Sequence, residues 1–182
     1  MTNLEFYGMF DYTTGDGDVY EYTSAEWSKL IEAMTSNGVS NGSFSMTSNG
    51  LTITAGGGTG FINGRYGYNT NSSTITLTAE SASLQRIDRI VLELDVSNRK
   101  IGLNVVKGTA ASTAAVPALT QTSLIYQIPL YQAKITNGST VTLTDERQIT
   151  YTTNQVMTAF NELAAEFADI QAGNSTVKAT YA

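Results

Sequence analysis

The stretch RIDRIVLELDVSNRKIGLNVV, residues 86–106, decides the fold of this chain. Apolar side chains recur at every second position in both of its halves: Ile90, Leu92 and Leu94, then Ile101, Leu103 and Val105. A period of two indicates a strand with one buried face. The polar residues in the middle supply a turn, so the stretch predicts a long β-hairpin with strands Arg86–Asp95 and Lys100–Lys107.

Seven further runs of β-branched and apolar residues flank this hairpin, and each is bounded by turn residues. Asn63-Gly64 joins two of them and is typical of a type I′ hairpin turn, because both positions need a positive φ. Residues 39–151 are therefore predicted to form a β-sandwich-like domain, with residues 108–122 as an extended surface loop. The other predicted strands are Phe44–Thr47, Leu51–Thr54, Gly60–Ile62, Arg65–Tyr68, Ser73–Leu77, Leu124–Lys134 and Thr140–Thr144.

An amphipathic helix is predicted before the β-domain. Thr23 and Glu26 have the spacing of a capping box, in which each side chain accepts a hydrogen bond from the other residue's backbone N–H. Apolar residues then follow at helical spacing from Trp27 to Met34, so a helix is expected from Ser24 to about Ser36. Together with two short strands expected at residues 4–10 and 19–22, it makes up an N-terminal unit, 1–38.

A second helix is predicted in residues 152–172, and a polar tail follows it in residues 173–182. Large apolar residues are spaced alternately by four and three positions, which is the heptad track of a coiled coil. The helix could pack this seam on its own sheet, but a seam at the end of the chain favours self-association. Aromatic residues at a and aliphatic residues at d fit a trimer as well as a dimer. The predicted oligomer interface consists of Val156, Phe160, Leu163, Phe167 and Ile170.

The composition of the 182 residues excludes several classes of function. The chain has no His and no Cys, which rules out disulfides, imidazole and thiolate metal sites, and catalysis by a cysteine nucleophile or a histidine base. The net charge of −6 without a basic run argues against nucleic acid as a partner. No stretch approaches the ~20 apolar residues of a membrane span, and acids stand where a signal peptide would be basic. Neither membrane insertion nor a cofactor is expected.

Three local patterns could carry chemistry, but each has a more ordinary interpretation. Asp16, Asp18 and Glu21 could bind calcium, although acidic turn residues are usually only solvated. The charged residues of 86–89 and 145–147 could form a carboxylate–guanidinium active site, but ion pairs along strand edges that fix strand register are favoured. The run Gly56–Gly60 could cradle a phosphate, but a hairpin connection is the preferred interpretation since no Lys follows it.

Exposed tyrosines are the remaining candidates for a binding site. Aromatic rings stack on sugars, so a carbohydrate site is one interpretation, while a bridge between core and wet surface is the other. A glycosidase would need two close carboxylates, and no pair is marked by its spacing. The chain is therefore expected not to be an enzyme. The candidate carbohydrate contacts are Tyr66, Tyr68, Tyr126 and Tyr131.

Several stretches of the chain form a recognisable set: GFINGRYGYNT (60–70), RIDRIVLELD (86–95), Asn98-Arg99, VVKGT (105–109), YQIPLYQA (126–133) and Asp145-Glu146-Arg147. Together they resemble the N-terminal β-domain of tail-tip, baseplate and fibre proteins of bacteriophages and prophages. The resemblance covers about residues 1–150, and the block from RIDRIVL to KGT is its most specific part.

The resemblance implies a homotrimeric structural and attachment module that continues into a coiled coil. The chain would be made in the host bacterial cytoplasm and placed in the virion tail, where it links the tail to receptor-binding proteins. Because the chain stops shortly after the heptad helix, no separate receptor-binding domain is expected in its length. The alternative is a receptor-binding protein that recognises a host cell-surface carbohydrate.

Overall fold

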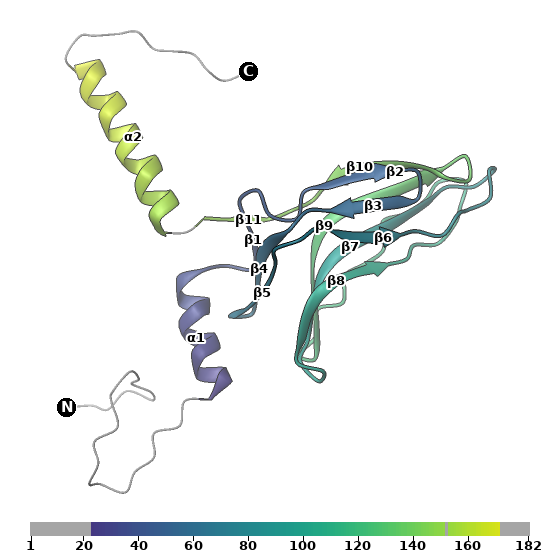
Figure 1. Ribbon diagram of the computed structural model, residues 1–182, viewed down its shortest axis with the longest axis horizontal. Helices are drawn as coiled ribbons and strands as arrows, with labels where there is room; N and C mark the ends of the chain where they lie inside the picture. Colours follow the sequence, from purple (N-terminus) through teal and green to yellow (C-terminus); the bar gives the residue numbers. More distant parts are fainter. Residues whose placement is uncertain (1–22, 152, 172–182) are drawn as a thin grey trace, which may run out of the picture.

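The computed structural model of the chain describes residues 23–151 and 153–171. The described part is mainly β, with three sheets and two helices, which confirms the prediction of a mainly β fold. Figure 1 shows the sheets gathered at one end of the molecule and both helices at the other. The strands expected at residues 4–10 and 19–22, and the tail 173–182, lie outside the described residues.

The predicted hairpin forms the centre of a four-stranded antiparallel sheet. Its strands are β7 (Arg86–Asp95), β8 (Lys100–Val106), β9 (Ile125–Thr136) and β10 (Thr140–Asp145). Their order is β10-β9-β7-β8, so β7 is hydrogen-bonded on both sides. Leu92 lies opposite Leu103 in the β7–β8 register, which places the apolar faces of the two strands together as the alternation predicts.

Two further sheets complete the β part of the molecule. One, in the order β11-β1-β4-β5, consists of β1 (Gly38–Ser40), β4 (Gly58–Ile62), β5 (Arg65–Asn69) and β11 (Ile149–Thr150). The other, in the order β2-β3-β6, consists of β2 (Met46–Asn49), β3 (Thr52–Ala55) and β6 (Ser73–Thr76). The sequence did not predict β1 and β11, which pair in parallel. The nine predicted strands are present, with ends within two residues of the expected positions.

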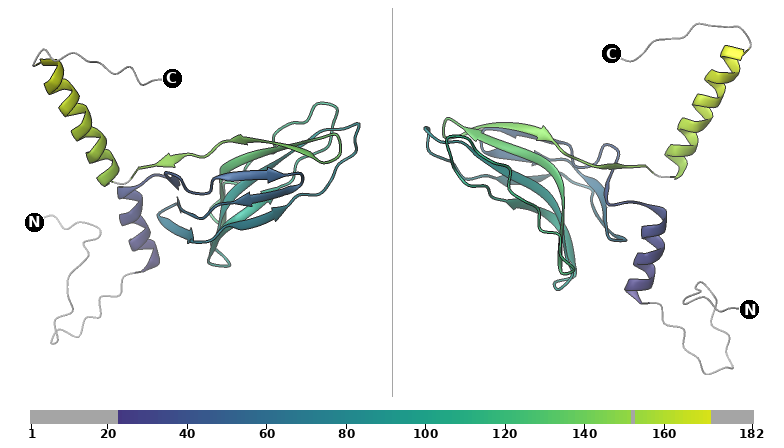
Figure 2. Two further views of the ribbon diagram at one scale, coloured as in Figure 1. Left: turned by 45° about the horizontal axis from the view of Figure 1, so that its top comes forward. Right: turned by 180° about the vertical axis from the view of Figure 1, so that it is seen from behind.

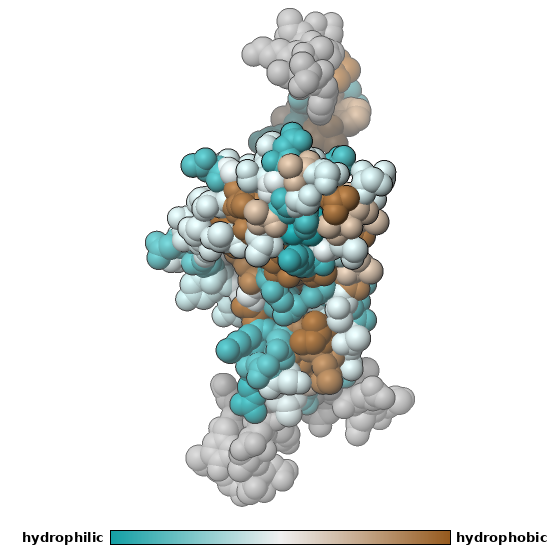
Figure 3. Space-filling model, turned by 90° about the vertical axis from the view of Figure 1, so that its right-hand side faces the viewer, coloured by the Kyte–Doolittle hydropathy of each residue, from teal (hydrophilic) through white to brown (hydrophobic). Residues whose placement is uncertain are grey.

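One apolar core joins the three sheets. Val39 and Ile62 come from the β11-β1-β4-β5 sheet, Ile53 from the three-stranded sheet, and Leu92 and Leu130 from the sheet around β7. All five side chains are buried. The outer surface is different in character: Figure 3, which looks onto the end opposite the helices, shows much of it pale, the colour of near-neutral residues, with scattered apolar patches. This agrees with the abundance of Thr and Ser in the sequence.

The register of β9 against β7 shifts by one residue in the middle of the strand. Ile90 pairs with Tyr131 and Val91 pairs with Pro129, so Leu130 is an extra residue on β9. Proline has no backbone N–H to give to a ladder, and a bulge is where a strand tolerates it. The register of β9 with β10 ends at Tyr131, so the part of β9 that precedes the bulge pairs with β7 and not with β10.

The segment between β8 and β9 is irregular, as predicted, but it is fixed to the sheet by hydrogen bonds. Gln85 exchanges two backbone hydrogen bonds with Ala111, at 2.8 and 2.9 Å. The guanidinium of Arg89 donates to the carbonyl of Pro117 at 3.2 Å. The segment therefore lies against the face of β7 that points away from the main core, where Val91 is fully buried.

Helix α1 spans Ser24–Met34, and its capping box is formed. The Thr23 backbone N–H donates to the Glu26 carboxylate at 2.6 Å, and the Glu26 N–H donates to the Thr23 hydroxyl at 3.3 Å. The helix ends two residues before the predicted end. Asn37, past that end, instead accepts a hydrogen bond from the backbone of Asn63 at 2.7 Å and so ties the helix exit to the β4–β5 turn.

The β4–β5 turn also sets how closely α1 approaches the sheets. Asn63 and Gly64 have φ of 48° and 65°, which are the values of the predicted type I′ turn. A Cβ added at Gly64 would overlap the backbone carbonyl of Ser28 in α1. Glycine is thus required here twice, for its positive φ and for the contact with the helix.

We expect Gly64→Ala to destabilise the fold by more than Gly50→Ala does. Gly50 also has a positive φ, of 57°, but a Cβ there would meet nothing within 4 Å. The control should cost about 1 kcal/mol, which is the left-handed penalty alone. The Gly64 variant should lose this free energy of unfolding and more, because its Cβ displaces α1. The displacement should also change the fluorescence of Trp27, the single tryptophan. Equal losses in denaturant unfolding would show that the helix contact is unimportant.

Candidate functional site

Helix α2 spans Thr153–Gln171 and places the whole predicted seam on one exposed stripe. The exposed fractions of the five seam side chains lie between 51% and 63%. Every described side chain of the helix, from residue 156 onward, is exposed. The seam residues are Val156, Phe160, Leu163, Phe167 and Ile170, and Met157 adds a further exposed apolar side chain beside them.

The helix does not pack this seam on its own sheets. In the views of Figures 1 and 2, α2 projects away from the β part of the chain. The interpretation in which the seam covers the chain's own sheet is therefore wrong for this structure. Exposed apolar surface of this kind is typical of interaction sites, and helices in proteins gain most of their stability from packing an amphipathic face.

The charges of α2 lie off the seam. Residues 153–171 contain Glu162, Glu166 and Asp169 and no Lys or Arg. In heptad positions Phe160 and Phe167 are a, which places Glu162 at c and Glu166 at g. The helix thus has a narrow apolar stripe and an acidic remainder, an arrangement that allows packing through the stripe alone.

The four candidate tyrosines do not form one site. Tyr66 and Tyr68 lie on the same side of β5, and their side chains are 60% and 70% exposed. Tyr126 is half-buried. Tyr131 is only 7% exposed, so its inclusion among the carbohydrate contacts is wrong. Alternation alone could not reveal this, because the register shift at Leu130 turns Tyr131 into the core cluster.

The first charged cluster is a closed, buried network. Arg86 donates two hydrogen bonds to Asp88, at 2.8 and 2.9 Å, and one to Glu80 at 2.7 Å. The side chains of Arg86 and Asp88 are 1% and 2% exposed. The sequence favoured a position along a strand edge, but these two side chains continue the buried core face of β7. Such burial leaves a substrate no access, and the full pairing of the charges makes the cluster structural.

The second charged cluster joins the chain after β10 to the rest of the fold. Glu146 accepts two hydrogen bonds from Arg89, at 2.8 and 3.0 Å, and one from Gln132 at 2.7 Å. Arg147 binds Asp145 and also donates to the backbone carbonyl of Ser43 at 2.8 Å. The sequence favoured ion pairs that fix the register of strand edges, whereas these ion pairs connect distant parts of the chain.

The glycine run is a crossing between sheets and not a hairpin connection. Gly56 and Gly57 pair with the segment before β2, through hydrogen bonds of 2.8 Å to Ser45 and 3.1 Å from Phe44. A Cβ on Gly57 would come 2.6 Å from the carbonyl oxygen of Asn69. The residues after β3 therefore need glycine to pass from the three-stranded sheet into β4.

The described residues carry no cluster of three or more His, Cys, Asp or Glu that could hold a metal ion. The candidate calcium ligands Asp16, Asp18 and Glu21 lie outside the described residues. Within residues 23–151 and 153–171, neither helix has the length and hydropathy needed to cross a membrane.

Helix α1 has an exposed apolar surface that its sequence pattern does not reveal. Trp27, Leu30 and Met34 were expected as the apolar face of an amphipathic helix, but they are 48%, 38% and 71% exposed. The buried side of the helix is instead the small residue Ser28, which faces the β4–β5 turn. Helical periodicity identifies an apolar face but not the surface that covers it.

Comparisons of the chain with protein-family models, with curated proteins and with solved structures gave no match.

The Asp145–Arg147 pair predicts a pH dependence of stability. Hydrogen bonds from Arg147 lower the pKa of Asp145 from 3.8 to about 2. A lowered carboxyl pKa stabilises the fold above the unfolded value, and this contribution is lost as the pH falls from about 4 to about 2. Because the Asp145 side chain is 47% exposed, solvent screening limits the contribution to about 1 kcal/mol.

We therefore expect Asp145→Asn to lower the free energy of unfolding at pH 7 and to make little difference near pH 2. Arg147→Met should give a similar pH profile, and the double variant should lose less than the sum of the two single losses. Urea unfolding between pH 2 and 7 measures these differences. A deficit for Asp145→Asn that stays constant over this range would contradict the assignment.

Proposed function

We propose that the chain is a homotrimeric structural component of a bacteriophage tail, a baseplate or tail-tip adaptor or a short fibre that links the tail to receptor-binding proteins. In this proposal a sandwich-like β-domain docks with other virion proteins, and α2 forms a three-stranded coiled coil. The exposed seam of α2 is the observation that supports the trimer. The resemblance of residues 1–150 to phage tail proteins supports the location in the virion.

The physical argument begins with the five seam side chains, all of which are more than half exposed. Burying an apolar side chain of this size contributes about 1.5–3 kcal/mol. Three helices together can bury all fifteen seam side chains around one axis, which more than offsets the loss of freedom on association. The acids at c and g stay outside the seam, where a parallel arrangement leaves them in water.

The first test is the oligomer mass of seam variants. The chain should sediment as a trimer, with three times the mass of 19.5 kDa. Phe160→Asp combined with Phe167→Asp should give monomers, because each trimer would otherwise bury six carboxylates. The matched control is Asn161→Asp with Ala165→Asp, which adds the same charges at b and f, away from the seam. Monomeric wild type, or equal masses for the two variants, would refute the trimer.

Location in a tail is tested separately, by a density map of an assembled particle that carries this chain. The proposal predicts three copies of the β-domain around the tail axis with α2 on that axis. Copies that lie away from the axis or without three-fold symmetry would contradict it.

A second function, recognition of a host cell-surface carbohydrate, is favoured by one observation. Tyr66 and Tyr68 stand side by side on an edge strand of a sheet, and both rings are largely exposed. Exposed aromatic rings suit stacking on sugars. This function is compatible with the trimer, since β5 and α2 are separate parts of the chain (Figure 1).

A further inference from the structure

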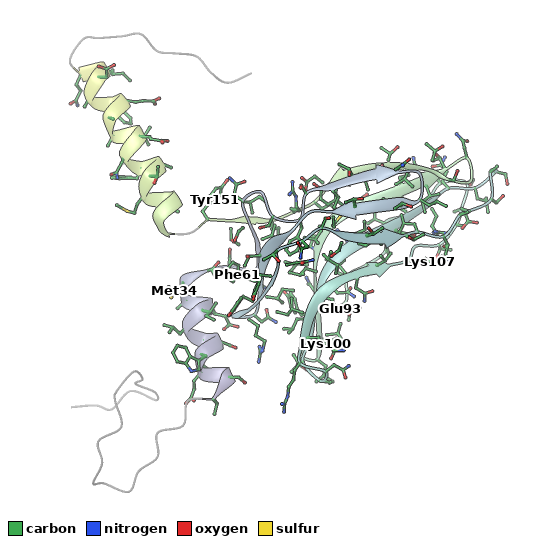
Figure 4. The ribbon with its side chains drawn as sticks, viewed as in Figure 1. Met34, Phe61, Glu93, Lys100, Lys107 and Tyr151 are labelled. Carbon is green, nitrogen blue, oxygen red and sulfur yellow. The ribbon has the colours of Figure 1, made fainter. Side chains whose placement is uncertain are left out.

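A cleft of about 640 Å³ lies where α1, β5 and the turn of the β7–β8 hairpin meet. This size is in the range of small-ligand sites. We call it the α1–hairpin cleft, and its walls include Trp27 from α1, Arg65 and Tyr66 from β5, and Arg99 and Lys100 from the hairpin. Figure 4 shows Lys100 near the tip of this hairpin, at the opposite end of β8 from Lys107.

The charged side chains that line the cleft are all cations. Arg65, Arg99 and Lys100 line it, and no Asp or Glu does. Among the described residues, none of the three is within ion-pair distance of a carboxylate. Asp95 lies near Lys100, but both of its oxygens accept hydrogen bonds from Asn98. In a chain with a net charge of −6, the wall of this cleft is locally positive, which favours an anion over a cation.

The backbone of Arg99 supports a functional origin for these charges. Its φ is 54°, in the left-handed region that glycine and asparagine adopt at lower cost. Stability alone would therefore favour Gly or Asn at this position. A strained residue at a cleft points to a role for its side chain in binding, and Arg99 is one of the residues that line the cleft.

Aromatic rings form the other part of the walls. Trp27 and Tyr66 are large apolar side chains in the cleft wall, and they remain 48% and 60% exposed. Gly67 lets β5, which carries Tyr66, approach the hairpin closely, since a Cβ at Gly67 would come 2.7 Å from Ile101. Trp27 lines the same cleft from α1. Such rings can stack on the C–H face of a sugar.

We propose that the α1–hairpin cleft binds an acidic saccharide, a sugar that carries a carboxylate or a phosphate. The sugar ring stacks on Trp27 or Tyr66, and its anionic group accepts charge-assisted hydrogen bonds from Arg99, Lys100 and Arg65. An acidic peptide side chain would satisfy only the cations, whereas an acidic sugar uses both the cations and the rings. The inference goes beyond the trimeric assembly and does not rest on it.

The direct test measures binding of three probes to the full chain by isothermal titration calorimetry. A hyaluronan tetrasaccharide carries carboxylates, N-acetylglucosamine 1-phosphate carries a phosphate, and chitotetraose is a neutral control. At least one acidic probe should bind at least tenfold more tightly than chitotetraose, and its affinity should fall as salt is raised. Which of the two acidic probes binds distinguishes a carboxylate ligand from a phosphate ligand.

Variants separate binding from folding. Arg99→Gly should weaken binding of the acidic probe about tenfold and leave the melting temperature unchanged or higher, because it relieves the left-handed strain. Lys100→Ala should also weaken binding. Lys107→Ala is the matched control, because it removes a cation just beyond the other end of β8, away from the cleft, and should leave binding unchanged. Trp27→Ala should weaken binding of the acidic probe as well.

Failure of both acidic probes to bind, or equal affinities for wild type and Arg99→Gly, would overturn the proposal. A synthetic peptide with the acidic and aromatic sequence of residues 1–22 serves as a competitor. The proposal would also be overturned if this peptide bound saturably and neither acidic saccharide did. The Phe160→Asp and Phe167→Asp double variant should retain saccharide binding, because one chain forms the whole cleft. A failure of the trimer is thereby distinguished from a failure of the cleft.

Discussion

The position of β7 between β8 and β9 is the constraint on which the rest of the molecule depends. Its inner face contributes Ile90, Leu92 and Leu94 to the core and ends in the buried Arg86–Asp88 pair. A buried guanidinium is tolerated only when its donors are satisfied, and here Asp88, Glu80 and the backbone of Thr78 accept from it. The segment before β7, which contains Thr78 and Glu80, must therefore lie next to the Arg86 guanidinium. On the other face, Arg89 holds both the segment before β9 and the segment after β10.

Much of this fold could be predicted from the sequence, because its signals are local. Alternation gave β7 and β8, and Asn63-Gly64 gave the β4–β5 hairpin. The missed strands, β1 and β11, are three and two residues long and pair in parallel across more than a hundred residues, so no local pattern marks them. The shift at Leu130 was also hidden, although Pro129 is a signal that a strand is interrupted there.

The candidate sites show the same division. The seam of α2 could be predicted from its heptad spacing, because all of its residues belong to one continuous helix. The α1–hairpin cleft was missed because its residues come from three separate segments, and only the tertiary structure brings Trp27, Tyr66 and Arg99 together. Trp27, Leu30 and Met34 of α1 stay exposed for a related reason, since the residue of the helix that packs against the β4–β5 turn is Ser28. Both helices thus carry exposed apolar side chains, while the buried core lies between the sheets.

The central claim is that the seam of α2, exposed in one chain, is buried between copies. The chain has no Cys, so a single Leu163→Cys variant can carry one spin label for each copy. In a parallel coiled coil, labels at this d position lie within roughly 20 Å of one another, because packed helix axes are about 10 Å apart. Dipolar spectroscopy should show this short distance with the modulation of three coupled spins, and a longer distance for Ala165→Cys on the outer face. No dipolar coupling in Leu163→Cys would contradict the claim.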